Sequence, residues 1–233
     1  MNILALDSSA VSASVALVTE KKIIGEFFCN TGLTHSQTLV PMIDALLQTA
    51  KLTLADVDAV AVCAGPGSFT GIRIGVAAVK GMAMALDKPC IAVSTLEAAA
   101  MNMLGENCVV CAVMDARCSQ VYNALFRIKN GVIERLCEDR ALLIEELADE
   151  LCGMNEKIML VGDGAGLCAE KIGNSIPNLN LAPMNLRYQR ASGTAMAALH
   201  VNPEEYLTAQ QLMPRYLRLP QAERELRKKQ NQA

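Results

Sequence analysis

The chain has 233 residues, of which 52% are hydrophobic, so it can bury a sizeable core, but it has no tryptophan and few other aromatic residues. A net charge of −3 argues against a protein that grips phosphates by itself, and the scarcity of aromatic rings argues against stacking of single-stranded bases. Several of the nine cysteines lie within apolar runs, and no secretion signal precedes the first predicted strand. Both features favour reduced thiols in a cytoplasmic protein without a membrane segment.

The first half of the chain alternates between strand and helix patterns. Short apolar runs predict strands, and apolar residues at helical spacing predict helices. The predicted elements are strands at 2–7, 13–19, 22–29 and 57–64, helices at 35–50 and about 69–86, and a strand–helix unit at 89–104. The first three strands form an antiparallel meander, and the alternation that follows is typical of an α/β fold.

From about residue 106 the same pattern starts again in a shorter form. The predicted elements are a buried strand ending at Asp115, strands at 121–128 and 131–137, a helix at 141–152, a strand and Gly-rich turn at 157–166, and helical segments over 190–212. Two related halves predict two lobes with a cleft between them. The predicted boundaries are a first lobe at 1–105 and a smaller second lobe at 106–189. Helices at about 190–219 either follow the second lobe or pack back on the first, and a basic tail occupies 220–233.

Three turns that carry aspartate follow predicted strands, where ligands bind in open α/β sheets. Facing acidic turns suit a divalent cation and nucleotide phosphates, and a Gly-rich turn suits an adenosine. The predicted nucleotide cleft consists of Asp7, Ser8, Gly65, Gly67, Asp115, Gly162, Asp163 and Gly164. The alternative is that Asp, Ser and Gly are simply favourable turn residues.

The segment 63–86 is the most specific stretch of the chain. Its glycines permit a tight passage from strand to helix with free N–H groups, although no Walker A lysine follows. The helix is apolar nearly all round, which predicts cover on more than one face, either by a partner chain or by deep burial in the chain's own core. We favour a partner face made of Leu39, Met42, Ile43, Leu46, Ile72, Val76 and Val79.

Other candidate chemistries are weakly supported. The two histidines, His35 and His200, have no acidic cluster near them that would complete a metal site, and no serine stands in a nucleophile elbow. Cysteines 108 and 111 lie on a strand, where residues three apart point to opposite faces. A basic cluster near the end of the chain suits either a solvated terminal helix or a contact with RNA or an acidic partner. It comprises Arg215, Arg218, Arg224, Arg227, Lys228 and Lys229.

Several motifs together resemble the bacterial TsaB (YeaZ) family: MNILALDSS at the start, His35-Ser36-Gln37, AGPGSFTGIRIGVAAVKGMA over 64–83, and VMDAR before Val121-Tyr122. The resemblance implies a two-lobed actin-like fold of the ASKHA, ribonuclease-H-like kind, with a truncated second lobe. It also implies a partner subunit without a catalytic site, which works with the paralogue TsaD and the ATPase TsaE to add threonylcarbamoyl to the adenosine beside the anticodon of tRNA.

The same resemblance carries further expectations. The chain is expected to meet tRNA only indirectly through the complex and to need no cofactor, weak nucleotide binding aside. The apolar partner face separately predicts a homodimer when the chain is alone. The catalytic paralogue carries a His-x-x-x-His metal motif where this chain has Thr95 and Ala99, and neither residue replaces a histidine on a transition metal. Two alternatives remain open: a small-molecule kinase or ATPase of the same fold, and a peptidase, for which no nucleophile–base pair is visible.

Overall fold

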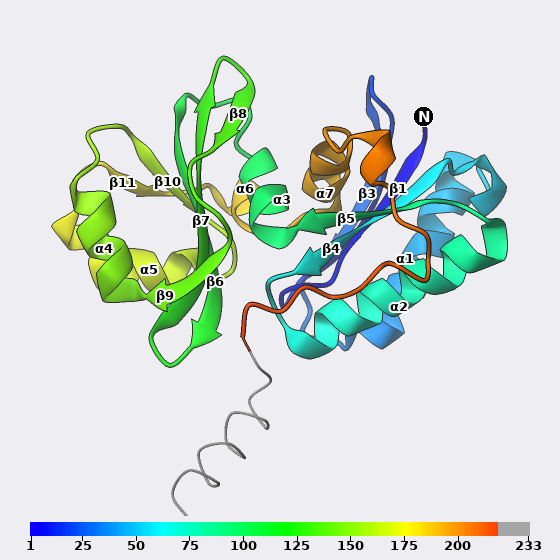
Figure 1. Cartoon of the computed structure of the whole chain (residues 1–233), viewed down its shortest axis with the longest axis horizontal. Helices are drawn as coiled ribbons and strands as arrows, with labels where there is room; N and C mark the ends of the chain where they lie inside the picture. Colours follow the sequence, from blue (N-terminus) through cyan, green and yellow to red (C-terminus); the bar gives the residue numbers. More distant parts are fainter. Residues whose placement is uncertain (219–233) are drawn as a thin grey trace, which may run out of the picture.

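The structure, a computed structural model, describes residues 1–218 as two β-sheets joined through a pair of helices (Figure 1). The first sheet has the strand order β3-β2-β1-β4-β5. Its strands are β1 (Ile3–Asp7), β2 (Ala13–Val18), β3 (Ile23–Cys29), β4 (Ala59–Gly65) and β5 (Cys90–Ser94). β1, β2 and β3 pair antiparallel, which confirms the predicted meander, and β4 and β5 run parallel to β1.

Two long helices cover one face of this sheet. α1 (His35–Ala50) is followed by a 3₁₀ turn (Leu54–Asp56), and α2 (Phe69–Leu86) follows β4. The Ser68 hydroxyl caps α2 by accepting the Gly71 N–H at 3.2 Å, and the helix ends where Asp87 takes up a left-handed conformation. Both helices therefore begin and end close to the residues predicted from their apolar spacing.

The second sheet has the order β11-β10-β6-β7-β8, with β9 paired to β7. Its strands are β6 (Cys108–Arg117), β7 (Gln120–Lys129), β8 (Val132–Arg135), β9 (Arg140–Leu143), β10 (Ile158–Val161) and β11 (Leu179–Leu181). The accompanying helices are α4 (Ile144–Cys152), α5 (Ala165–Ile172) with a 3₁₀ turn at Gly173–Ser175, and α6 (Met184–Arg187).

The two sheets share one topology. β6, β7, β8, β10 and β11 take the places that β1, β2, β3, β4 and β5 take in the first sheet, with the same parallel and antiparallel pairings. The repeat predicted from the sequence is thus present in the strand order. It accounts for a fold with two related α/β halves.

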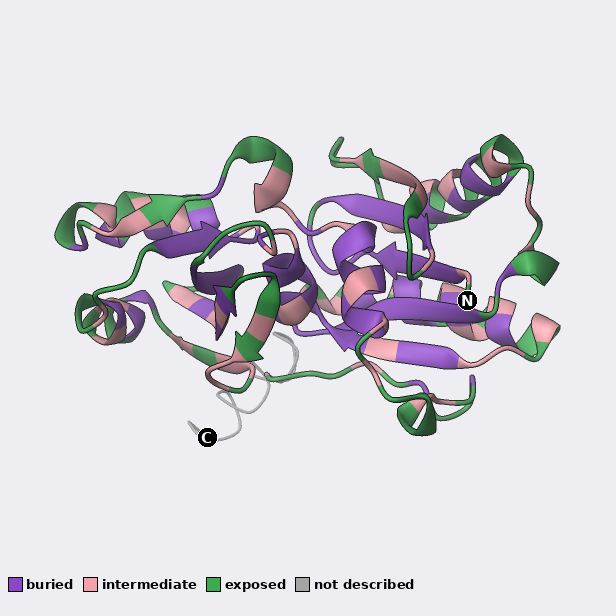
Figure 2. Cartoon of the chain, turned by 90° about the horizontal axis from the view of Figure 1, so that it is seen from above, coloured by how far each residue is buried: buried purple, intermediate pink, exposed green. Residues whose placement is uncertain are grey.

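The helices α3 (Thr95–Met101) and α7 (Ala191–Ala198) lie against each other between the sheets. α7 packs its alanines on the first sheet although it follows the second sheet in the chain, and α3 also contacts β6 and β7. A Cβ on Gly193 of α7 would meet the Ala98 carbonyl oxygen at 2.2 Å, so the two backbones approach closely there. Figure 2 shows buried residues concentrated through this centre and exposed residues on the outer helices and loops.

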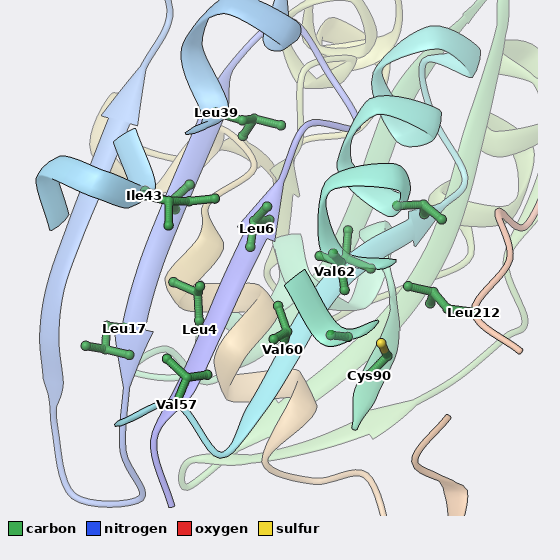
Figure 3. Close-up of a cluster of buried hydrophobic side chains, with 14 of the residues drawn as sticks. Leu4, Leu6, Leu17, Leu39, Ile43, Val57, Val60, Val62, Cys90 and Leu212 are labelled. Carbon is green, nitrogen blue, oxygen red and sulfur yellow. The ribbon is translucent and has the colours of Figure 1, made fainter. Parts of the chain in front are cut away.

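The inner faces of α1 and α2 form the core of the first lobe, which corrects the predicted partner face. Leu39 and Ile43 of α1 point toward β1 and β2 (Figure 3), and they are 1% and 2% exposed. Six of the seven predicted interface side chains belong to this buried cluster, and Met42 packs against it. The buried ones are Leu39, Ile43, Leu46, Ile72, Val76 and Val79. These side chains cannot meet a partner without unfolding the lobe.

α2 is the one helix within residues 1–218 whose length and composition would allow it to cross a membrane. Its apolar inner face is accounted for by packing on β4, because Ile72, Val76 and Val79 are all buried there. Lys80 also donates from this helix to the Leu212 carbonyl oxygen at 3.0 Å. The apolar character of the helix therefore has an explanation within the fold.

A terminal strap, defined as residues 206–218, crosses the first lobe after a 3₁₀ turn at Pro203–Glu205. Leu207 pairs with Cys90 at the edge of β5, and Leu212 is fully buried in the core of the lobe. The Arg215 N–H then donates to the Ala64 carbonyl oxygen at 2.7 Å. The strap is thus fixed along its length, and in Figure 1 it runs beside α2 toward the junction of the lobes.

Two sequence predictions differ from the structure, and a third lies outside the residues that it describes. The helix predicted over 141–152 begins only at Ile144, because residues 140–143 pair with β7 as a strand. Of the helical segments predicted over 190–212, only α7 and the 3₁₀ turn are helical, since the strap is extended along the first lobe. The predicted basic tail, including Arg224, Arg227, Lys228 and Lys229, lies outside the described residues.

Candidate functional site

The first aspartate turn, after β1, is closed in on itself. Asp7 is 1% exposed, and its carboxylate accepts the Ser9 N–H at 2.9 Å, the Ser9 hydroxyl at 2.6 Å and the Cys63 thiol at 3.1 Å. The Ser8 hydroxyl donates to the Gly71 carbonyl oxygen at 2.9 Å. The Ser8 and Ser9 hydroxyls and the Ser9 N–H are therefore already used within the protein.

Burial governs the electrostatics of this turn. Removal from water raises the pKa of Asp7, although the Ser9 and Cys63 hydrogen bonds act in the opposite direction. The same burial, with the nearby Asp7 carboxylate, raises the pKa of the Cys63 thiol well above its usual range. Cys63, which also lies 3.1 Å from the Thr194 hydroxyl, is an inert core thiol and not a nucleophile.

The glycines after β4 and in α2 close the first turn further. A Cβ on Gly67 would meet the Ser9 carbonyl oxygen at 2.4 Å, and a Cβ on Gly75 would meet the Ser8 hydroxyl at 2.4 Å. Gly65 similarly lies against the Arg215 carbonyl oxygen of the strap, at 2.1 Å from a built Cβ. These glycines let the chain pack tightly on itself at the point where a phosphate-binding loop would stay open.

The other two aspartate turns lie together in the second lobe. A Cβ on Gly162 would meet the Val113 carbonyl oxygen at 2.0 Å, and one on Gly164 would meet the Asp115 nitrogen at 2.9 Å. Asp163 accepts from the Gln189 side-chain amide at 3.2 Å. Burial, with added repulsion from the Asp115 carboxylate, raises the pKa of Asp163 to about 6.

The structure therefore brings only part of the predicted nucleotide cleft together. Asp115, Gly162, Asp163 and Gly164 are neighbours, whereas Asp7 and Ser8 are buried within the first lobe. The space between the halves is occupied where Gly67 meets Met114, whose Cε lies 3.0 Å from a Cβ built on that glycine. Because Asp7 is buried and its carboxylate is bonded to Ser9 and Cys63, it is not exposed on one side of an open cleft as the sequence led us to expect.

An open pocket lies elsewhere at the lobe junction, with a volume of about 470 Å³. Arg135 lines it and bridges Glu97 at 2.8 Å and Asp139 at 2.7 Å, while the Ser94 hydroxyl donates to Asp139 at 2.6 Å. These contacts join β8 of the second lobe to α3 and β5 of the first. Sequence reasoning missed them, because the partners come from segments about 40 residues apart that show no shared motif.

The outer surfaces of α1 and α2 carry apolar side chains that the core does not use. Val40 is 54% exposed and Met84 is 62% exposed. On α2 the exposed positions include Ala77 and Gly81, and a Cβ on Gly81 would meet nothing within 4 Å. We call these two outer surfaces the α1–α2 face.

Comparison with known proteins shows the family to which the chain belongs. A family model described as TsaD, tRNA N6-adenosine threonylcarbamoyltransferase, matches residues 30–223. A Bacillus subtilis protein named tRNA threonylcarbamoyladenosine biosynthesis protein TsaB is 30% identical over 96% of this chain and 96% of its own length. A TsaB of Haemophilus influenzae is 30% identical over 94% of each chain. The chain belongs to the TsaB family.

A solved structure agrees with this assignment. YeaZ from Pseudomonas aeruginosa superposes with a TM-score of 0.77 at 29% identity, covering 93% of this chain and 99% of that one. The chain thus has the two-lobed, actin-like fold expected of a TsaB-family protein. The strand order repeated in its two sheets is the structural basis of that fold.

The positions at which the catalytic paralogue would hold a metal are part of the core in this TsaB-family chain. Thr95 is fully buried and Ala99 is 1% exposed, both on α3 between the lobes. Within residues 1–218 no group of three or more His, Cys, Asp or Glu side chains is placed to hold a metal ion. His35 instead makes a 2.8 Å hydrogen bond through Nε2 to the Ala10 carbonyl oxygen.

Proposed function

We propose that this chain is a cytoplasmic partner subunit, without a catalytic site of its own, in the machinery that adds threonylcarbamoyl to the adenosine beside the anticodon of tRNA. In this role it binds the paralogue TsaD and acts together with the ATPase TsaE. The observation that carries the proposal is the match to proteins named for tRNA threonylcarbamoyladenosine biosynthesis over almost the whole chain.

The geometry of the first turn supports a role without bound nucleotide. Asp7 and Ser8 are buried and hydrogen-bonded within the chain, so Mg²⁺ and phosphate would have to displace protein contacts to reach them. This favours the partner role over the alternative of a small-molecule kinase or ATPase. Binding of ATP·Mg by the isolated chain with submicromolar Kd, accompanied by turnover, would reverse that preference.

We place the contact with TsaD on the α1–α2 face. The sequence pointed to these two helices, and because their inner sides are buried in the core we assign the contact to their exposed outer sides. Small residues such as Ala77 and Gly81 let a partner helix approach closely, with Val40 and Met84 as apolar anchors. The same face would join two copies of the chain in a homodimer when TsaD is absent.

A matched pair of glycine substitutions tests this placement. Gly81 on α2 and Gly166 on α5 are both exposed, and neither has an atom within 4 Å of a built Cβ, so arginine fits at either position. Gly81→Arg should weaken capture by TsaD at least about tenfold, because a long charged side chain would have to be buried in the contact. Gly166→Arg should bind TsaD like the unaltered chain.

The measurement is titration calorimetry with purified TsaD, after thermal melting has established that both variants are folded. Equal affinity of the two variants for TsaD would remove the α1–α2 face from the contact. Loss of affinity in Gly166→Arg alone would move the contact to the second lobe.

A further inference from the structure

The arginines of residues 1–218 fall into two groups. Four of them form ion pairs with carboxylates, namely Arg127, Arg135, Arg140 and Arg190. The others have no carboxylate within ion-pair distance in the described part of the chain, and these are Arg73, Arg117, Arg187, Arg215 and Arg218. Four of the second group come from segments that contact one another.

A series of contacts joins three of these four arginines, Arg73, Arg117 and Arg218, at the end of the strap. The Arg73 guanidinium lies 5.1 Å from the centre of the Phe69 ring, and that ring stacks on Tyr216 with centroids 4.9 Å apart. Arg218 then donates to the Ala116 carbonyl oxygen at 3.0 Å, next to Arg117 in the β6–β7 turn. We call Arg73, Arg117, Tyr216 and Arg218 the arginine band, whereas Arg215 lines the pocket that also contains Glu97 and Asp139.

The band is presented by fixed backbone. The strap is anchored just before it by buried Leu212 and by the hydrogen bond from the Arg215 N–H to the Ala64 carbonyl oxygen. Figure 1 shows the strap reaching the junction of the lobes beside α2. Tyr216 keeps 43% of its surface exposed although one ring face is stacked on Phe69. A ligand would therefore meet preplaced groups with little ordering of the chain.

The chemistry of the band suits a polyanion with flat groups. Guanidinium groups that lack a carboxylate partner are suited to bind phosphate oxygens, and an exposed aromatic ring stacks with an unpaired base. Asp115 lies in the same turn, and its carboxylate accepts the backbone N–H of Arg117 at 2.7 Å and forms no ion pair with the guanidinium. Lys171 adds a further cation at the same turn through its 2.9 Å hydrogen bond to Ser119.

We infer that the arginine band binds RNA directly, contacting the phosphate backbone and one unpaired base of a tRNA. The inference rests on the proposed function for the choice of RNA, and it revises the expectation that this chain meets tRNA only through its partners. The exposed ring adds a base-stacking contact to the phosphate contacts of the arginines, which is why we choose RNA, and the test below separates RNA from an acidic protein surface.

The test measures binding of the full chain to a fluorescein-labelled tRNA transcript by fluorescence anisotropy, over a series of salt concentrations and without TsaD. The double variant Arg73→Gln/Arg117→Gln should raise Kd at least about tenfold at roughly 0.1 M salt. It should also reduce the slope of log K against log salt by about 1 for each arginine removed. Tyr216→Ala should raise Kd by about tenfold with the slope unchanged.

A charge-matched control separates the band from the overall charge of the chain. Lys21 and Lys22 are exposed in the turn between β2 and β3, so Lys21→Gln/Lys22→Gln removes the same charge elsewhere on the surface. It should leave tRNA affinity within about twofold of the unaltered chain. Neither double variant removes a hydrogen bond that holds the strap, and thermal melting would verify their folding.

Three results would overturn the inference: no measurable tRNA binding up to about 100 µM chain, an equal loss in both double variants, or a loss of TsaD binding in the arginine variant with tRNA affinity intact. The last would assign the band to a protein contact. Failure of the partner role would instead show in the TsaD titration with Gly81→Arg, so the two proposals fail separately.

Discussion

Asp163 holds its carboxylate at the edge of the second lobe in an environment that disfavours charge. Its pKa of about 6 lies above the ordinary value for aspartate, first because of burial and then because of the neighbouring Asp115. A folded-state pKa that is raised contributes stability below the unfolded pKa near 4, and this contribution is lost as the pH rises through about 6. At neutral pH the charged carboxylate therefore destabilises the fold.

Asp163→Asn should remove this penalty. The asparagine oxygen can still accept the Gln189 amide, so the free energy of unfolding at pH 7 should rise by about 1–3 kcal/mol. At pH 4 the variant and the unaltered chain should be nearly equal. Urea unfolding at several pH values measures the difference, and Asp149→Asn on the exposed surface of α4 serves as control. The assigned environment would be contradicted if the gain in free energy of unfolding over the unaltered chain were no larger at pH 7 than at pH 4.

At the scale of elements, the contact between α2 and the turn after β1 closes the first aspartate turn. Gly75 of α2 leaves room for the Ser8 hydroxyl, which lies 2.4 Å from a Cβ built on that glycine. Alanine normally stabilises a helix interior by about 0.5–1 kcal/mol relative to glycine. A helix glycine whose replacement by alanine destabilises the protein therefore reports close packing, and this is the feature that closes the first turn.

Gly75→Ala should lower the free energy of unfolding by about 1–3 kcal/mol through overpacking. Adding Ser8→Ala removes the obstructing oxygen, so the double variant should recover most of that loss, with a coupling free energy of about 1 kcal/mol or more. Gly81→Ala in the same helix has open space and should be neutral or slightly stabilising. Additive effects of Ser8→Ala and Gly75→Ala in denaturant unfolding would show that the turn does not pack on α2 as described.

The elements were largely predictable from the sequence, whereas the neighbours of each element were not. Apolar spacing gave α1 and α2 their bounds, but a helix that is apolar nearly all round does not reveal whether its own sheet or a partner covers a given side. Val76 of α2 packs on β4 and is 3% exposed. A Val76→Glu substitution would therefore test folding of the lobe and not binding of a partner. The strap was missed for a related reason, since its pairing with Cys90 joins residues far apart in sequence.

Only part of the candidate site could be predicted, because the composition of a turn does not reveal whether the turn is open or tightly packed. Asp, Ser and Gly suit both open phosphate-binding turns and tightly packed ones, and the sequence does not distinguish the two. In the second lobe Asp115 and Gly164 do lie together. In the first lobe the Ser9 hydroxyl donates locally to the Asp7 carboxylate, and the Cys63 thiol also donates to it, a contact that appears only once β1 and β4 are paired.

At the scale of the whole molecule, the structure describes a protein whose two lobes are joined by shared packing as well as by the chain. α7 covers the first sheet after the chain has built the second, and α3 lies between the two. The ion pair of Arg135 with Glu97 adds a second link across the junction. Such a molecule is suited to present fixed surfaces to partners, and we propose the α1–α2 face for TsaD and the arginine band for RNA.

The most direct test of the partner role is reconstitution of the modification reaction from purified components. TsaD, TsaE, threonylcarbamoyl-adenylate and unmodified tRNA would be combined with and without this chain, and threonylcarbamoyladenosine would be measured by mass spectrometry of the digested tRNA. We expect modification only when the chain is present, and neither ATP hydrolysis nor tRNA modification by the chain alone. Equal modification without the chain would contradict the proposed role.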